Sequence, residues 1–411
     1  MVVALRTHDN SLVAYLDWFW HSRTFRTIGR LQSKDKPLVV LLGSVAIAQI
    51  LSGVYVLVDW ARFGTTGGWA FGLALLVSYP VVIAHLFALG IAVRRVCYYL
   101  THPKKLGKII VAYFLERQVK RLRRKHHFTV VAVAGSVGKT STKAAIAQLL
   151  GQNLRVRYQQ GNYNDRTTVP LIFFGQTQPN IFNVFAWARI FGENTARIEH
   201  PYPYDVVVVE IGTDGPGQMK QFAYLKPDIT VLTAITPEHM AEFVTIDAVA
   251  TEELEIFRYS KRVLVNGDDV PGKYLIGRDF EEYSTRTNVA HNYYAKRTTT
   301  NLRGQDLALE FPGAKLDIHT VFVGEQGARI ALAAAATADM LGMDRRVIAE
   351  SMSSLSPMPG RMQILDGQKQ STIIDDSYNA SPEPIMRALD VLYSAKASQR
   401  VAVLGSMNEL G

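Results

Sequence analysis

The sequence has a single cysteine, Cys97, among 411 residues. One thiol excludes an intramolecular disulfide and any zinc site built from several cysteines. Acidic residues are also in deficit, since 36 Asp and Glu stand against 45 Lys and Arg, a formal net charge of +9. A moderately basic chain is compatible with nucleic acid or with an anionic membrane as its partner. The length predicts two or three domains with sizeable cores.

Two long stretches lack formal charge altogether. Residues 37–58 form an uncharged run of 22 residues, and residues 67–93 form a second run with Pro80 and His85 inside it. Both runs are long enough to cross a bilayer as helices, and a membrane helix tolerates an internal proline. The alternatives are a buried core helix and a signal peptide. The first run begins too far from Met1 and is too long for the apolar region of a signal peptide.

Basic residues flank this pair of runs on both outer sides, whereas the connection 59–66 carries little charge. The nearest are Arg23, Arg26, Arg30, Lys34 and Lys36 before the first run, and Arg94, Arg95, Lys104, Lys105 and Lys108 after the second. This asymmetry predicts a two-pass hairpin in the cytoplasmic membrane with both ends in the cytoplasm. The basic stretch 117–125 is compatible with nucleic acid, but beside a membrane helix it favours anionic lipid headgroups, and we expect no nucleic-acid partner.

The stretch 128–150 combines a strand, a glycine-containing turn and a helix. Residues 128–134 are rich in Val, as in a buried parallel strand, and residues 139–150 have the Ala-rich composition of a helix. Glycines let backbone N–H groups approach phosphates, and the helix N-terminus adds its positive dipole end. Val133 stands where the eight-residue Walker pattern has its first glycine. The predicted nucleotide-binding residues are Gly135, Ser136, Val137, Gly138, Lys139, Thr140 and Ser141.

Strands and helices alternate after this stretch. The Val- and Ile-rich segments 205–211, 228–234 and 262–266 predict strands, and the Ala-rich segment 326–341 predicts a helix. We therefore predict an α/β fold, a P-loop-type, mostly parallel sheet with helices on both faces. Segment 176–204 is expected to be irregular, packed on the core or touching the membrane, and segment 285–322 to be β-rich.

The turn 357–360 reads as a linker to a second α/β unit. That unit begins with a predicted strand at 372–375, a helix at 383–393 and a strand at 400–404, and we expect it to be the truncated start of a Rossmann-like domain. The predicted N-terminal part has an amphipathic, basic segment (1–36), a transmembrane hairpin (37–100) and a basic juxtamembrane helix (101–127). The central domain (128–358) and this incomplete domain (359–411) follow.

Polar residues follow the predicted strands, where ligands bind in open α/β sheets. Glu210 ends the strand 205–211, and His239 lies just beyond the strand 228–234. A hydroxyl, a carboxylate and an imidazole near a phosphate-binding loop can hold Mg²⁺, which keeps several waters and few protein ligands. A histidine considered alone is more often structural than a ligand.

Eight separated motifs occur in the order found in the Mur ligase family. They are AGSVGKTSTK (134–143), GNYNDRTTVPL (161–171), VVEIGTDGPGQM (208–219), TAITPEHMAEF (233–243), VNGDD (265–269), PGRMQ (359–363), DDSYNASPE (375–383) and VLGSMNELG (403–411). From about residue 130 to residue 411 the chain resembles this family, and within it the MurF type of UDP-N-acetylmuramoyl-tripeptide–D-alanyl-D-alanine ligase.

The resemblance implies an ATP- and Mg²⁺-dependent ligase of peptidoglycan precursor synthesis. Such an enzyme phosphorylates a carboxylate to an acyl phosphate, which an amine then attacks. The implied partners are a UDP- or lipid-linked muramoyl peptide and an amino acid or D-Ala-D-Ala. Two alternatives remain open. One is a Mur-type ligase with another acceptor or amine donor, such as a glutamate-adding enzyme. The other is a non-catalytic nucleotide-binding membrane scaffold.

The resemblance also implies individual roles around the phosphates. Lys139 and Thr140 would bind the ATP phosphates and the first Mg²⁺, which Glu210 would share. His239 would bind a second Mg²⁺, and Arg361 would face the phosphates from across the domain junction.

Other roles lie at the two ends of the substrates. Residues in the segment that meets the acceptor peptide are Asn162, Asn164 and Thr167. Residues on the nucleoside side are Asn266 and Asp268 near adenine, Asp376 near the ribose, and Tyr378 in the same loop.

The chain departs from the family pattern at three places. Glu253 stands where the family has a carbamylated lysine, and we hypothesise that its carboxylate bears on the second Mg²⁺, although a helix-surface role is the alternative. The GxHNxxN signature reads GEQGARI at 324–330, which predicts looser adenine recognition. The membrane hairpin and basic helix replace the soluble UDP-binding domain, so the acceptor is either bound elsewhere or lipid-linked.

Overall fold

The computed structural model describes residues 36–64, 69, 72–73, 101–159, 161, 163–286 and 292–407, in two units that meet between Leu106 and Gly107. In the first unit, helix α4 (Lys36–Phe63) covers the first uncharged run. Its segment Gly43–Arg62 is long and apolar enough to cross a membrane. Apart from residues 69, 72 and 73, the second uncharged run lies outside the described residues.

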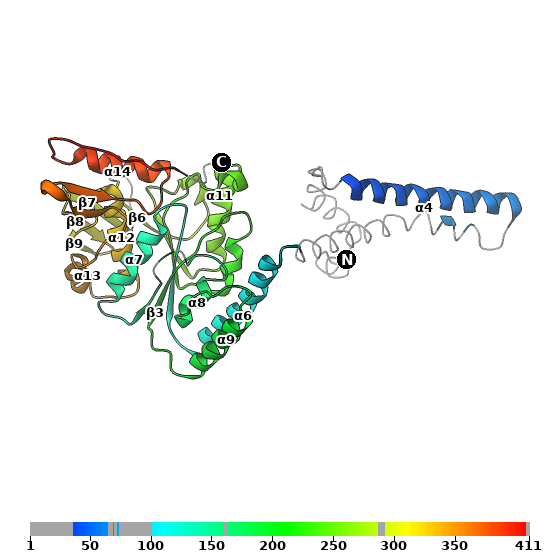
Figure 1. The fold of residues 1–411 in the computed structure, drawn as a ribbon, viewed down its shortest axis with the longest axis horizontal. Helices are drawn as coiled ribbons and strands as arrows, with labels where there is room; N and C mark the ends of the chain where they lie inside the picture. The colour runs from blue at the N-terminus through cyan, green and yellow to red at the C-terminus, as the bar shows by residue number, and fades with distance from the viewer. Residues whose placement is uncertain are drawn as a thin grey trace. The chain divides into compact units, whose positions relative to one another are not determined.

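A nine-stranded, mostly parallel sheet forms the centre of the second unit (Figure 1). The strand order is β2-β3-β1-β4-β5-β6-β7-β8-β9, parallel from β2 to β7 and antiparallel thereafter. The strands are β1 (Thr129–Ala134), β2 (Val156–Arg157), β3 (Val206–Glu210), β4 (Ile229–Leu232), β5 (Arg262–Asn266), β6 (Glu281–Ser284), β7 (Tyr293–Asn301), β8 (Gly304–Phe311) and β9 (Ala314–Thr320). The predicted α/β sheet and the β-rich segment are therefore confirmed, with the β-rich segment forming the antiparallel edge.

Helices cover both faces of this sheet, because its central strands are buried on both sides. One core joins the sheet to α7 (Lys139–Leu150), α12 (Gly324–Met340) and α13 (Arg345–Met352). The opposite core joins the sheet to α8 (Val169–Phe174), α11 (Ile246–Glu253) and the end of α6 (Pro103–Lys125). The shorter helices are α10 (Met240–Phe243), η2 (Met219–Tyr224), η3 (Leu254–Arg258) and η4 (Gly272–Tyr274).

The sequence analysis predicted that segment 176–204 is irregular. The structure instead has the helix α9 (Val184–Glu199) in this segment. Asn183 caps it by accepting a hydrogen bond from the N–H of Ala186 at 3.0 Å. Trp187, Ile190, Asn194 and Ile198 recur at helical spacing and are buried. This stripe packs α9 against α6, so most of the segment lies on the domain.

The C-terminal part begins with the antiparallel pair β10 (Gln363–Asp366) and β11 (Thr372–Asp375), joined through η5 (Gln368–Gln370). Helix α14 (Pro382–Ser394) follows and contacts α12. The prediction of a strand at 400–404 was wrong. This segment has no pairing partner among the described residues, and Val403 is 92% exposed. A strand needs a neighbour for its backbone hydrogen bonds.

Candidate active site

The loop between β1 and α7 has the backbone of a phosphate-binding turn. Gly135 has φ of +118° and Gly138 has φ of +85°, values that favour glycine. A Cβ on Gly135 would lie 2.5 Å from Thr233 Oγ1 and 2.8 Å from the backbone nitrogen of Ala234. The loop is therefore pressed against the end of β4 and cannot carry a side chain at Gly135.

Lys139 begins α7 and lies among carboxylates. Its Nζ donates to the carbonyl oxygens of Gly135 and Ser136, the latter at 3.2 Å, and lies 3.7 Å from Glu238 Oε2. Burial opposes the charge of this ammonium, but Glu238, Glu253 and Glu210 outweigh burial and raise the pKa of Lys139. The loop therefore holds a permanent cation beside its glycines.

Glu210, at the end of β3, binds two residues of α7. Its Oε1 accepts from Thr140 Oγ1 at 3.2 Å, and its Oε2 accepts from Lys143 Nζ at 3.0 Å. The side chains of Lys143 and Glu210 are 0% and 2% exposed. The sequence analysis missed Lys143, although its place one turn after Lys139 on the same helix is a signal that it faces the loop.

Glu253, at the end of α11, turns its carboxylate to the same loop. Its Oε2 accepts from the N–H of Gly135 at 2.9 Å, whereas its Oε1 is buried with no hydrogen-bond partner. Burial raises the pKa of Glu253 to about 8, against the influence of Lys139. Glu238 also has one buried carboxylate oxygen, Oε1, without a hydrogen-bond partner.

We expect Glu253→Gln to remove a pH dependence of folding. The pKa of the carboxyl is about 8 in the folded protein and near 4.5 when unfolded. The stabilisation that its proton provides is complete below pH 4.5 and is lost as the pH rises to 8. With EDTA present, thermal unfolding of the full chain in detergent should show wild-type stability falling more steeply between pH 5 and 8 than that of Glu253→Gln. Glu350→Gln, at an exposed position, should retain the wild-type slope, and parallel slopes for Glu253→Gln would contradict the assignment.

His239 lies just beyond β4, where the sequence analysis placed it, and precedes α10. It has a left-handed backbone with φ of +46°, and its Nε2 lies 3.7 Å from Asp214 Oδ1. Of the four predicted metal ligands, the structure joins Thr140 to Glu210 and places Glu253 at the start of the loop. Within the described ranges, no group of three or more His, Cys, Asp or Glu side chains is arranged to hold a metal ion.

A cavity of about 80 Å³ opens between the loop and the C-terminal part. It is lined by Gly138 and Ser141 on one side and by Arg361 and Asp376 on the other. The Arg361 guanidinium lies over the ring of Tyr378 at 4.2 Å, and its Nε is buried without a hydrogen-bond partner. Burial lowers the pKa of Arg361 and raises that of Asp376, so both groups are desolvated at this junction.

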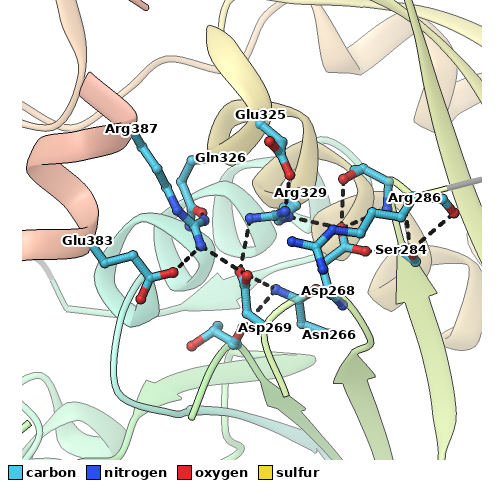
Figure 2. A network of polar contacts seen from close by, with 12 residues as sticks. Asn266, Asp268, Asp269, Ser284, Arg286, Glu325, Gln326, Arg329, Glu383 and Arg387 are labelled. Carbon is cyan, nitrogen blue, oxygen red and sulfur yellow. Dashed lines mark hydrogen bonds and ion pairs between the residues drawn. The ribbon is translucent and has the colours of Figure 1, made fainter. Parts of the chain in front are cut away.

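Figure 2 shows a buried ionic network beside this cavity. Arg329 of α12, 2% exposed, donates from Nε to Asp268 Oδ2 at 2.9 Å and from Nη1 to Asp269 Oδ2 at 3.0 Å. Asp269 also accepts from Arg387 of α14 at 2.9 Å, so one carboxylate joins the central and C-terminal parts. The sequence analysis missed both arginines, because nothing local marks them as partners of the turn after β5.

Two predicted nucleoside-side residues belong to this network. Asn266 is 2% exposed and donates to the carbonyl oxygen of Thr233 at 2.8 Å. Burial works against the charge of Asp268, but hydrogen bonds from Ser284, Thr285 and Arg329 lower its pKa to about 2. Both side chains are thus engaged by protein groups.

The predicted acceptor segment lies against α6. Asn162 is outside the described residues, whereas the carbonyl oxygen of Asn164 accepts from the N–H of Gly212 at 3.1 Å. Thr167 is buried, and its N–H donates to Asp165 Oδ1 at 2.8 Å. Arg166 pairs with Glu116 of α6. The segment is therefore held by the helix that precedes the domain.

The residues around the loop fit a nucleoside triphosphate with a divalent cation. The backbone at Gly135 has no room for a Cβ, and Lys139 carries a positive charge. Both features suit the binding of phosphates. The unpartnered Nε of Arg361 is a further donor for an anion, and the unpartnered oxygens of Glu253 and Glu238 are hard donors of the kind Mg²⁺ prefers. The fold and the site define the class, a P-loop-type α/β protein with a nucleotide site at the carboxyl edge of its sheet.

Comparison with known proteins identifies the family. The model of the Mur ligase middle domain matches residues 133–338, about half of the chain, and that of the Mur ligase, glutamate ligase domain matches residues 360–411. The chain belongs to the Mur ligase family.

Relatives of the MurF type share this region. The chain is 28% identical to the UDP-N-acetylmuramoyl-tripeptide–D-alanyl-D-alanine ligase of Bacillus subtilis over 69% of its own length and 57% of that protein. The MurF structure from Acinetobacter baumannii superposes with a TM-score of 0.60 at 21% identity, covering 72% of this chain and 61% of that one. The MurF ligase of Thermotoga maritima in complex with ADP has a TM-score of 0.56 at 22% identity, with coverage of 73% and 65%. The chain thus spans less than two thirds of the length of each of these three relatives.

Proposed function

We propose that the protein is a membrane-anchored, ATP- and Mg²⁺-dependent amide ligase of peptidoglycan precursor synthesis. It activates a carboxylate as an acyl phosphate and joins it to an amine such as that of D-Ala-D-Ala. One observation carries the proposal, namely that the loop that holds Lys139 and Thr140 borders, through Gly138 and Ser141, a cavity that Arg361 lines from the C-terminal part. Glu210 accepts a hydrogen bond from Thr140 beside this loop. The Bacillus subtilis relative is named for this reaction, and the Thermotoga maritima structure contains ADP.

The residues provide charge neutralisation and positioning, which phosphoryl transfer requires. Lys139 holds the terminal phosphates of ATP, and Arg361 approaches them from the C-terminal part. The Thr140 hydroxyl and the Glu210 carboxylate hold the first Mg²⁺, and His239 the second. Mg²⁺, when bound, neutralises charge on the phosphate oxygens.

Glu253 takes the place of the carbamylated lysine of the family. Its unpartnered Oε1 is available to the second Mg²⁺, directly or through a water, without a need for CO₂. Because the carboxyl is buried, a bound cation would also favour its charged form. Supplementation with bicarbonate should therefore leave wild-type activity unchanged.

Nucleotide selection is looser than in relatives with the GxHNxxN signature. Gly327 replaces the first Asn of that signature, and a Cβ there would lie 2.6 Å from the carbonyl carbon of Phe322. The local backbone thus excludes the missing side chain. Asn266 and Asp268 support the adenine side through the ionic network, and Asp376 and Tyr378 lie on the ribose side.

The acceptor is a muramoyl peptide, UDP- or lipid-linked, that meets Asn162, Asn164 and Thr167. A two-pass hairpin formed by α4 and residues 67–93 holds the catalytic part at the cytoplasmic face of the membrane. The apolar composition of α4 supports this anchoring.

Phosphate release tests the proposed reaction. Detergent-solubilised full chain is given ATP, Mg²⁺ and UDP-MurNAc-tripeptide or D-Ala-D-Ala, singly and together. Release that requires both carbon substrates is expected. Release with a different amine or with a lipid-linked acceptor only would identify another Mur-type ligase, and no release with any pair would favour a scaffold.

A further inference from the structure

Exposed apolar side chains lie on two neighbouring helices of the second unit. They come from the first half of α6, from the start of α9 and from the turn just before α9; the two helices lie side by side in Figure 1. We call this set the aromatic patch; its members are Ile109, Ile110, Tyr113, Phe114, Phe182, Val184 and Phe185. Phe185 is the most exposed of them, at 90%, and exposed apolar residues that lie close together, unlike single ones, mark interaction surfaces.

The parallel packing of α6 and α9 brings these residues to one end of the pair. A Cβ on Gly107 would lie 3.0 Å from Ile181, the rings of Phe114 and Phe191 are 5.9 Å apart, and Gln118 donates to the carbonyl oxygen of Phe191. The start of α9 therefore adjoins the start of α6. This is the end at which the chain enters from its apolar N-terminal region.

Basic residues continue the same exposed side of α6. Arg117 donates to the hydroxyl of Tyr113 at 3.0 Å, and Lys120 and Arg124 follow one and two turns later. None of these three cations forms an ion pair with another described residue. Aromatic side chains beside such cations are typical of surfaces that rest in the headgroup region of an anionic bilayer.

Chain length limits how far this surface can lie from a membrane. Gly107 follows Val93, the last residue of the second uncharged run, by 14 residues. Even fully extended, that linker spans at most about 50 Å. If the run is inserted in a bilayer, the start of α6 lies within about 50 Å of it, so the aromatic patch is within reach of the headgroups.

We infer that the aromatic patch docks on the surface of an anionic lipid bilayer. This inference rests on the membrane anchoring proposed above and adds a second, peripheral contact to it. Two ion pairs join α6 to the predicted acceptor segment, Lys108 with Asp165 at 3.8 Å and Glu116 with Arg166. Docking would therefore hold the acceptor segment beside the headgroups, where a lipid-linked carboxylate arrives.

Lipid quenching of a fluorescent label tests the docking. In the full chain with Cys97→Ser, a label is attached at Phe185→Cys or, as a matched control on α14, at Tyr393→Cys, which replaces an 81% exposed side chain. The protein is reconstituted in phosphatidylethanolamine–phosphatidylglycerol vesicles that contain a lipid spin-labelled on its acyl chain. We expect quenching at position 185 to exceed that at position 393 roughly twofold or more.

The same samples separate the two proposals. Flotation after carbonate extraction first shows whether the chain is anchored, and a chain that does not float overturns both anchoring and docking. A chain that floats but shows equal quenching at the two positions overturns docking alone. Protection of position 185 from aqueous iodide without lipid quenching would also overturn docking, in favour of a protein partner such as a second copy.

Discussion

Replacing Lys139 with methionine is expected to lower ATP-dependent phosphate release about 100-fold or more, the range found when one preorganised charge-stabilising group is removed. Methionine keeps much of the side-chain volume but removes the cation from a loop bordered by Glu238, Glu253 and Glu210. The Glu210 and Glu238 carboxylates would then repel the phosphates. The loss should appear in both kcat and the affinity for ATP.

Folding of the Lys139→Met variant has to be shown separately. The pKa of Glu253 is about 8, so this carboxyl is protonated at neutral pH and does not become a stranded buried charge. We therefore expect a far-UV circular dichroism spectrum like that of the wild type. Lys315→Met, which removes a surface lysine paired with Glu310, should keep full activity. Phosphate release by Lys139→Met at the wild-type rate would contradict the assignment of the loop as the nucleotide site.

Local patterns were sufficient to predict the centre of the fold. The segment 262–266 coincides with β5, and three other predicted strands lie within a few residues of β1, β3 and β4. Runs of Val and Ile bounded by polar residues and glycines are strong signals for buried parallel strands. The same reasoning placed Glu210 correctly at the end of a strand, next to Thr140.

Features that depend on tertiary packing were not predicted. Helix α9 alternates buried and exposed aromatic residues. Which of them are buried is decided by the packing of α9 on α6, which no local pattern shows. Lys143 and Arg329 look like surface cations in the sequence, but in the fold each is buried beside carboxylates from distant strands and turns. The segment 400–404 has the composition of a strand, but within the part of the chain that the structure describes it pairs with no neighbouring strand.

Replacing Arg329 with methionine is expected to destabilise the protein by about 3 kcal/mol, the lower end of the cost of breaking a buried ion pair. The guanidinium holds Asp268 and Asp269 at 2.9 and 3.0 Å, and its side chain is only 3% exposed. Without it, two carboxylates remain buried with fewer donors. Thermal unfolding of the full chain in detergent should show a fall of roughly 6 to 12 °C in Tm, because 1 kcal/mol corresponds to about 2 to 4 °C in a domain of this size.

Two further variants decide whether stranded charge is the cause of this destabilisation. Arg258→Met removes a 77% exposed guanidinium that pairs with Glu255, and its cost should stay within about 0.5 kcal/mol. Adding Asp268→Asn to Arg329→Met removes one of the unpaired charges, so the double variant should be more stable than Arg329→Met alone. If the losses of unfolding free energy of the two single variants simply add in the double variant, Arg329 acts through its packed volume. The ionic network would then contribute little to joining the two parts of the site.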